Sequence, residues 1–215
     1  PVPPLPTREH SREPARSCTE IRSQLLLPDD HLPLGRAHQL ASVVVKESRR
    51  AGIAIDTLIS VGDVRRYEPA VGSVEVLGVA AAAEHRAVLS RLARLPIAIV
   101  SQPRDDSIRI VTERGPVTVH LTIPEDAGAA LVWHTGSSAH ISALRQRAAE
   151  RGLHFQKAQL TEKTGRPVRC PSEDDLYDYL DLPLIPPELR SGSDEITSAE
   201  QNAIPPLVLE RHMRG

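Results

Sequence analysis

The order of helical and extended patterns between residues 34 and 123 constrains the fold of this chain more than any other feature. Apolar side chains follow helical spacing in two segments and alternate or cluster as in strands in five others. The segments are, in order, helical at 34–50, extended at 55–62 and 74–81, helical at 83–95, and extended at 96–102, 107–113 and 117–123. Helix, two strands, helix and three strands predict an α+β domain whose helices pack on one mixed sheet.

The pattern changes after Pro124. Two helical segments at 125–136 and 138–152 precede a small predicted ribbon at 153–170, and Ser172 is a predicted N-cap for a short acidic helix. A Pro-rich segment follows it. These changes predict three parts, namely an extended Pro- and Arg-rich arm at 1–30, a domain at 31–123, and a smaller α/β domain with a C-terminal linker at 124–215.

Composition excludes several kinds of function. Charged residues make up 25% of the chain and the formal net charge is −2, so any contact with nucleic acid must come from a local patch. Aromatic residues make up only 2%, which argues against a platform for stacking bases. Cys18 and Cys170 lack metal-type spacing, which favours a reduced, cytoplasmic setting. No apolar run is long enough to cross a membrane, so we expect no membrane partner.

The stretch "VGDVRRYEPAVGSVEV" at residues 61–76 is the most informative local motif. Gly62, the pair Arg65 and Arg66, and the turn at Gly72 and Ser73 lie between two short extended runs. Glycine lets backbone approach a ligand closely, and arginine forks match the geometry of phosphate. The stretch therefore indicates a site for a nucleotide phosphate.

Several motifs in one order resemble those of family X DNA polymerases. "GDVRR" resembles the family's Gly-Ser-x-Arg-Arg, "VGSVEVL" its Gly-Asp-x-Asp strand, and "VTVHL" the strand with its third aspartate. "WHTGSSAHISALRQRAAERG" resembles Tyr-Phe-Thr-Gly-Ser followed by the thumb helix, and "SEDDLYDYLDLPLIPPELR" resembles a stretch of bacterial members. The resemblance spans about 34–215 and implies a nucleotidyltransferase-type palm followed by a thumb.

The positions that match the family's three metal-binding aspartates are Ser73, Glu75 and His120. Family X enzymes bind two magnesium ions there, and magnesium prefers charged oxygen ligands. A hydroxyl, one carboxylate and an imidazole are a poor replacement, so the resemblance implies a catalytically degenerate pseudoenzyme that needs no cofactor. The alternative is an active polymerase or nucleotidyltransferase with an atypical site, in which Asp63 and Glu75, together with His120, hold magnesium, manganese or zinc.

The resemblance also implies a nucleotide-binding set of Gly62, Asp63, Arg66, Trp133, Gly136 and Ser137. Five of these six residues, all but Gly62, have a structural alternative. Asp63 is alternatively an acid that caps a turn or pairs with Arg65 or Arg66, and Trp133 is alternatively a half-buried core residue. The arginine pair is alternatively a solvated surface pair, and Gly136 and Ser137 alternatively cap a helix. Ile141, which follows on that helix, is apolar and is expected to face the core.

Arg145 and Arg147 on the thumb helix are the candidate DNA contacts, or else part of a solvated helix face. The resemblance therefore implies a DNA- or nucleotide-binding module related to DNA repair, or a scaffold for an attached PHP domain. A pure protein-interaction domain is the remaining alternative.

Overall fold

The computed structural model describes residues 31–201 and 203–205, so the arm predicted at 1–30 lies outside the described residues. The α+β class is confirmed, because helices pack on a mixed sheet. Within the described part of the chain, no helix combines the length and the apolar character that crossing a bilayer would require.

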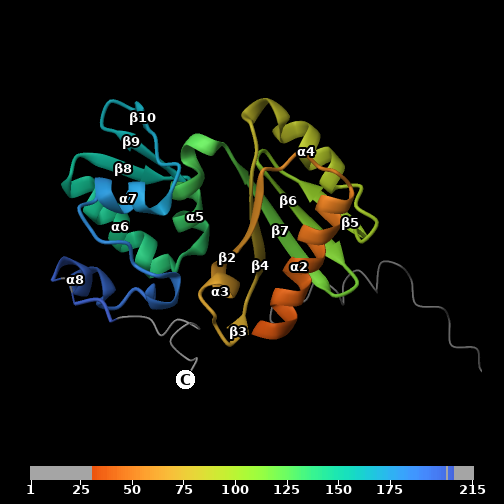
Figure 1. The fold of residues 1–215 in the computed structure, drawn as a ribbon, viewed down its shortest axis with the longest axis horizontal. Helices are drawn as coiled ribbons and strands as arrows, with labels where there is room; N and C mark the ends of the chain where they lie inside the picture. Colours follow the sequence, from red (N-terminus) through yellow and green to blue (C-terminus); the bar gives the residue numbers. More distant parts are fainter. Residues whose placement is uncertain (1–30, 202, 206–215) are drawn as a thin grey trace, which may run out of the picture. The chain divides into compact units, whose positions relative to one another are not determined.

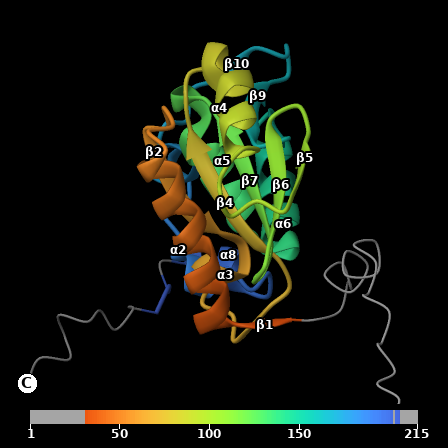
Figure 2. The same cartoon turned by 90° about the vertical axis from the view of Figure 1, so that its right-hand side faces the viewer.

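A five-stranded sheet organises residues 57–122, and its strands lie in the order β2-β4-β7-β6-β5. The bounds are Thr57–Val61 for β2, Val74–Val79 for β4, Val100–Pro103 for β5, Ser107–Thr112 for β6 and Gly115–Thr122 for β7. The neighbours β4 and β7 are parallel, whereas the other pairs are antiparallel. Figure 2 shows this order across the sheet, with β5 at one edge. The hairpin predicted between the last two strands is the turn that joins β6 to β7.

The two faces of this sheet differ because residues alternate along each strand. Val76 and Val119 point to the face covered by α2 (Leu34–Arg50) and α4 (His85–Leu92), and both are fully buried in that core. The opposite face is packed against α5 (Ala127–Thr135), as Figure 1 shows. Side chains on this second face, next to α5, are the ones that form the site described below.

Some local structure differs from the sequence prediction. Gly62 was predicted to end a strand, and the strand does end at Val61, but Gly62 also begins the short helix α3 (Gly62–Arg65). The predicted strand at 96–102 begins only at Val100. Two-residue strands β1 (Leu32–Pro33) and β3 (Ala70–Val71) pair with each other. Elements this short carry too few residues to show periodicity, which is why the sequence did not reveal them.

The second part of the chain builds a separate core around α6 (Ser138–Glu150). A three-stranded sheet of β8 (Leu153–Gln156), β9 (Gln159–Glu162) and β10 (Pro167–Val168) follows, and then α7 (Glu173–Tyr179). Ser172 caps α7 in a capping box with Asp175, as its sequence predicted. The Pro-rich segment also holds a 3-10 turn at Pro187–Leu189 and the helix α8 (Glu195–Glu200), which the sequence did not predict.

Two main clusters of buried residues lie on either side of Pro124 in the sequence. A small third cluster joins Val61 and Leu77 of the sheet to Ala130 of α5. The boundary near Pro124 stays a prediction, since the described residues from His31 onward cluster as one compact unit. The contact between α5 and the sheet is what brings residues of the two parts together at one site.

Candidate functional site

Glu75 and His120 lie on neighbouring parallel strands and meet on the face that α5 covers. In the register of β4 and β7, Leu77 is opposite His120 and Glu75 is opposite Thr118, so Glu75 and His120 are diagonal neighbours. The Nε2 atom of His120 lies 3.0 Å from Oε2 of Glu75. The Oγ of Ser73 donates a hydrogen bond of 2.8 Å to the other carboxylate oxygen. The three positions singled out by the sequence are therefore one hydrogen-bonded group.

His134 completes this group, and the sequence did not assign it a role there. It comes from α5, and its ring stacks on that of His120 with centroids 4.0 Å apart at 26°. Glu75, His120 and His134 offer ligand atoms that all lie within 4.8 Å of one another. The only signal in the sequence was that His134 occupies part of the pattern resembling Tyr-Phe. We call these three residues the Glu75–His120–His134 cluster.

Burial and neighbouring charge set the protonation of the cluster. Burial raises the pKa of Glu75, but the hydrogen bonds from His120 and Ser73 outweigh it and hold the pKa below its usual range. Burial, with a smaller effect of His120, lowers the pKa of His134 to about 4. The carboxylate is therefore ionised and His134 neutral near pH 7, which leaves an imidazole nitrogen free to accept or to coordinate.

The donors in this cluster do not fit a pair of magnesium ions. Magnesium requires near-octahedral oxygen coordination, usually with carboxylates that bridge to substrate phosphates. Here one carboxylate is already hydrogen-bonded through both oxygens, to Ser73 and His120, and the other donors are imidazole nitrogens. Imidazole suits zinc and other transition metals instead.

The structure does not bring Asp63 to this cluster. Its carboxylate lies 2.6 Å from Nη2 of Arg66 and accepts a hydrogen bond of 2.8 Å from the backbone N–H of Gly72. Among the described residues, the ligand-forming group contains Glu75 and His120 but not Asp63. The alternative interpretation of Asp63 as a turn cap and ion-pair partner is confirmed, while the metal site of Asp63, Glu75 and His120 stays a prediction that these contacts do not favour.

Arg65 and Arg66 connect α3 to the second part of the chain. Arg65 forms a bidentate ion pair with Glu173 of α7, at 2.8 and 2.6 Å, and also donates to Oγ1 of Thr135. Arg66 donates to the carbonyl oxygen of Thr135, and its side chain is only 12% exposed. The reading of this pair as solvated surface arginines is therefore wrong. A phosphate role for Arg66 stays a prediction.

Gly136 and Ser137 form the turn between α5 and α6. Gly136 has φ 71°, a conformation that favours glycine, and a Cβ there would lie 3.0 Å from Nη1 of Arg66. Ser137 is the N-cap of α6 and accepts a hydrogen bond from the N–H of His140. The backbone N–H of Ser137 donates to the carbonyl oxygen of Arg190. Helix capping is confirmed for Ser137, while anion contact by this turn stays a prediction.

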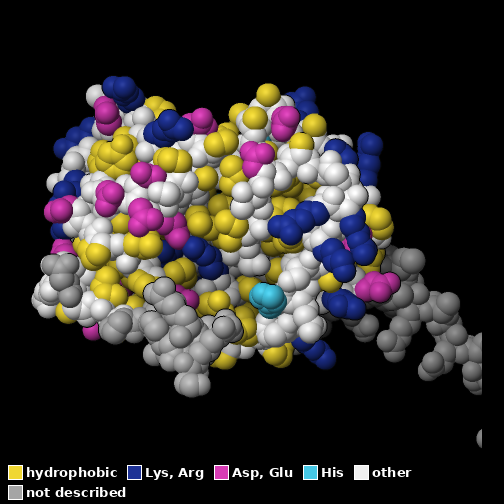
Figure 3. Space-filling view, in the orientation of Figure 1, with side chains coloured by type: hydrophobic (Ala, Val, Ile, Leu, Met, Phe, Trp, Pro, Cys, Tyr) yellow, Lys and Arg dark blue, Asp and Glu magenta, His cyan; other side chains and the backbone are white. Residues whose placement is uncertain are grey.

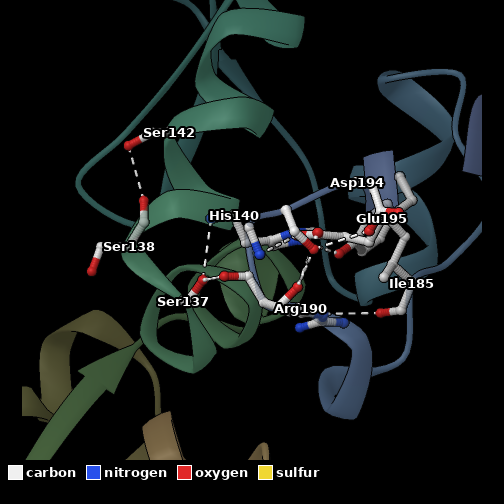
Figure 4. Close-up of polar contacts among 12 residues, drawn as sticks. Ser137, Ser138, His140, Ser142, Ile185, Arg190, Asp194 and Glu195 are labelled. Atoms are coloured by element: carbon white, nitrogen blue, oxygen red, sulfur yellow. Dashed lines mark hydrogen bonds and ion pairs between the residues drawn. The ribbon is translucent and has the colours of Figure 1, made fainter. Parts of the chain in front are cut away.

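A buried polar network lies directly behind this turn. Nδ1 of His140 is 2.8 Å from Oε1 of Glu195, and Nε2 is 2.9 Å from the hydroxyl of Tyr177. Figure 4 shows His140 and Glu195 meeting beside Ser137 and Arg190. Burial lowers the pKa of His140 to about 4, although the hydrogen bond to Glu195 opposes that effect. The sequence did not predict this network, because its members lie far apart along the chain.

The remaining candidate residues have clear structural surroundings. Trp133 is half-buried and packs edge-on against Phe155, with centroids 5.4 Å apart, which supports its reading as a core residue. Ile141 is buried, as expected. Arg145 is exposed on α6, whereas Arg147 donates to the carbonyl of Leu180 and pairs with Glu200. DNA contact by Arg145 and Arg147 stays a prediction, and the exposed side chain of Arg145 suits it better.

A cleft of about 610 Å³ opens beside the Glu75–His120–His134 cluster. His120 and His134 are part of its wall, and Arg104 and Lys157 face it from the two parts of the chain. Acidic side chains, Asp105, Asp106 and Asp126, lie in the same wall, so its charge is mixed. The cleft gives solutes access to the two imidazole rings.

Comparison with known proteins agrees with this architecture. Residues 130–191 match the family model described as DNA polymerase beta thumb. The chain is 29% identical over 170 residues to the protein named DNA polymerase/3'-5' exonuclease PolX of Bacillus subtilis (strain 168). That match covers 78% of this chain but only 30% of the relative. The chain is therefore similar to a family X DNA polymerase, and its residues 130–191 match the polymerase beta thumb.

Proposed function

We propose that this chain is a DNA-binding module derived from a family X polymerase palm and thumb, and that it does not extend DNA with magnesium. The observation that carries the proposal is the chemistry of the Glu75–His120–His134 cluster. Phosphoryl transfer by two metal ions needs charged oxygen ligands that neutralise the reacting phosphate. Glu75 supplies the only carboxylate of the cluster, and both its oxygens are engaged within the protein.

DNA contact is proposed for the thumb side. Arg145 is exposed on α6 and lines a hollow of about 300 Å³ together with Gln146 and Gln156. Side chains of this type contact the sugar-phosphate backbone, and such contacts fix position without reading sequence. The formal net charge is −2, and Figure 3 shows basic side chains at several places on this face, with acidic ones among them, rather than a face-wide basic field. A local, weak and salt-sensitive contact therefore suits the molecule.

The test is a titration of a labelled gapped DNA duplex with the full chain at several salt concentrations, followed by fluorescence anisotropy. We expect the binding constant to fall steeply as salt rises, because phosphate contacts release counterions. Arg145→Ala should weaken binding and reduce the log–log salt slope by about 1. The control is Arg86→Ala, which removes an exposed arginine from α4, on the other side of the sheet.

Absence of binding at low ionic strength would contradict the proposal and favour a pure protein-interaction domain. Equal losses in the Arg145 and Arg86 variants would mean that net charge alone, and not the thumb, governs binding. If the chain only scaffolds an attached PHP domain, neither variant should differ from the wild type in DNA binding in this assay.

A further inference from the structure

We infer that Glu75, His120 and His134 bind one zinc-class transition-metal ion between the sheet and α5. This inference goes beyond the proposed function and holds whether or not the chain binds DNA. One carboxylate and two imidazole donors are a frequent ligand set for zinc, which accepts nitrogen and oxygen ligands in a tetrahedral arrangement. Imidazole donors also suit cobalt, nickel and copper, whereas magnesium and calcium prefer oxygen.

The spacing of the donors fits one small ion. In tetrahedral zinc sites, with bonds of roughly 2.0–2.1 Å, neighbouring ligand atoms lie roughly 3.3 Å apart. Nε2 of His120 and Oε2 of Glu75 are 3.0 Å apart, close to that separation. All three donors lie within 4.8 Å of one another, so one ion can join them once the His134 ring turns out of its stack on His120. On binding, the ion takes the place of the proton between Nε2 of His120 and Oε2 of Glu75, and that proton is released to water.

The surroundings orient the carboxylate. Ser73 donates 2.8 Å to Oε1 of Glu75, which directs the other oxygen toward His120. Hydrogen bonds of this kind to a metal-binding carboxylate hold it in place and tune affinity. The side chains of Glu75 and His120 are 26% and 21% exposed, so the site is partly desolvated yet reachable from solvent.

Three protein ligands leave a fourth position open. His120 and His134 line the cleft described above, so the open position is available to a water molecule from that side. The ligands come from β4, β7 and α5. A bound ion therefore links the sheet to α5, the helix that begins the second part of the chain, and we expect it to stabilise the contact between them.

The test uses the full chain, freed of metal with a chelator, and a zinc titration in competition with a chromogenic zinc indicator. We expect one zinc per chain, and affinity at least about tenfold weaker in Glu75→Gln and in His134→Gln. The matched control is His154→Gln, which changes an exposed histidine on β8 and should keep wild-type affinity. A tenfold excess of magnesium should not displace the zinc.

A second measurement guards against variants that fail to fold. Cobalt(II) added to the wild-type chain should give the visible absorption of a tetrahedral ion, and zinc should abolish it. In addition, Ser73→Ala keeps all three ligands and should weaken zinc binding by less than either ligand variant. No stoichiometric zinc binding, no tetrahedral cobalt spectrum, or equal loss in the His154 control would each overturn the inference.

Discussion

Replacing Glu173 with glutamine should strongly destabilise the protein, because this carboxylate neutralises two arginines from distant parts of the chain. It accepts two hydrogen bonds from Arg65 of α3 and one of 2.9 Å from Nη1 of Arg190. The Arg190 side chain is fully buried, at 0% exposure, while those of Glu173 and Arg65 are 11% and 21% exposed. Among the described residues, 31–201 and 203–205, Arg190 forms its ion pair with Glu173.

Removing one partner of a buried ion pair costs about 3–5 kcal/mol, because the other charge is left uncompensated. We expect about 3 kcal/mol, the lower end, because water still reaches Arg65 and the carbonyl of Ile185 still accepts from Nε of Arg190. In a chain of this size, that loss corresponds to a fall of roughly 6–12 °C in Tm. Scanning calorimetry at neutral pH measures it directly.

The matched control is Asp174→Asn, which removes an acidic group from the same first turn of α7 without breaking an ion pair in the described structure. It reports the loss of helix-dipole stabilisation alone, about 0.3–1 kcal/mol. If Glu173→Gln lowers Tm by no more than Asp174→Asn, the two arginines do not depend on this carboxylate and the reasoning is refuted.

The difference in stability between the wild type and Glu173→Gln should depend on pH. Burial raises the pKa of Glu173, but hydrogen bonds and charge from Arg65 and Arg190 outweigh it and hold the pKa below 4.5. A carboxyl whose folded-state pKa is depressed stabilises the fold above its unfolded-state pKa and loses that effect as pH falls. The stability difference between wild type and Glu173→Gln should therefore shrink below about pH 4.5.

Three further predictions concern other parts of the fold. Burial lowers the pKa of His140 from 6.5 to about 4, so this side chain is neutral in the folded protein near pH 6, and the free energy of unfolding should fall as the pH is lowered from 6.5 to 4. In denaturant titrations, His140→Gln should reduce that fall by about 3 kcal/mol, and an unchanged dependence of the free energy of unfolding on pH would contradict the prediction. Gly128→Ala should cost about 1–3 kcal/mol because its Cβ would collide with the backbone of Ser172, whereas Gly35→Ala, in open space, should be neutral or stabilising in the same thermal scan. The Cys170 thiol, buried with its pKa raised to about 12, should resist alkylation in the native protein and react after unfolding, as measured by peptide mass spectrometry.

Long periodic segments made most of the fold predictable. The helical pattern at 34–50 became α2 with the same bounds, and the alternation at 117–123 became part of β7. Strand order could not be predicted, since the parallel pairing of β4 with β7 depends on contacts between distant segments. The helix α8 was missed because its short pattern follows a Pro-rich run that suggests a linker.

The candidate site was predictable only in part. Motif resemblance located Glu75 and His120, and strand geometry brings them together as neighbours. The third member, His134, reaches the cluster from α5, and nothing in local spacing shows which face of a helix will meet a sheet. For the same reason the sequence could not show that the carboxylate of Asp63 bonds locally, to Arg66 and Gly72.

The most direct test of the central claim is nucleotide incorporation on a gapped duplex in magnesium alone, with manganese and zinc in parallel reactions. The cluster has a single carboxylate, Glu75, which is held by Ser73 and His120 and cannot secure two magnesium ions. We therefore expect no incorporation in magnesium above the level seen without protein. Incorporation in magnesium that disappears in Glu75→Ala would contradict it.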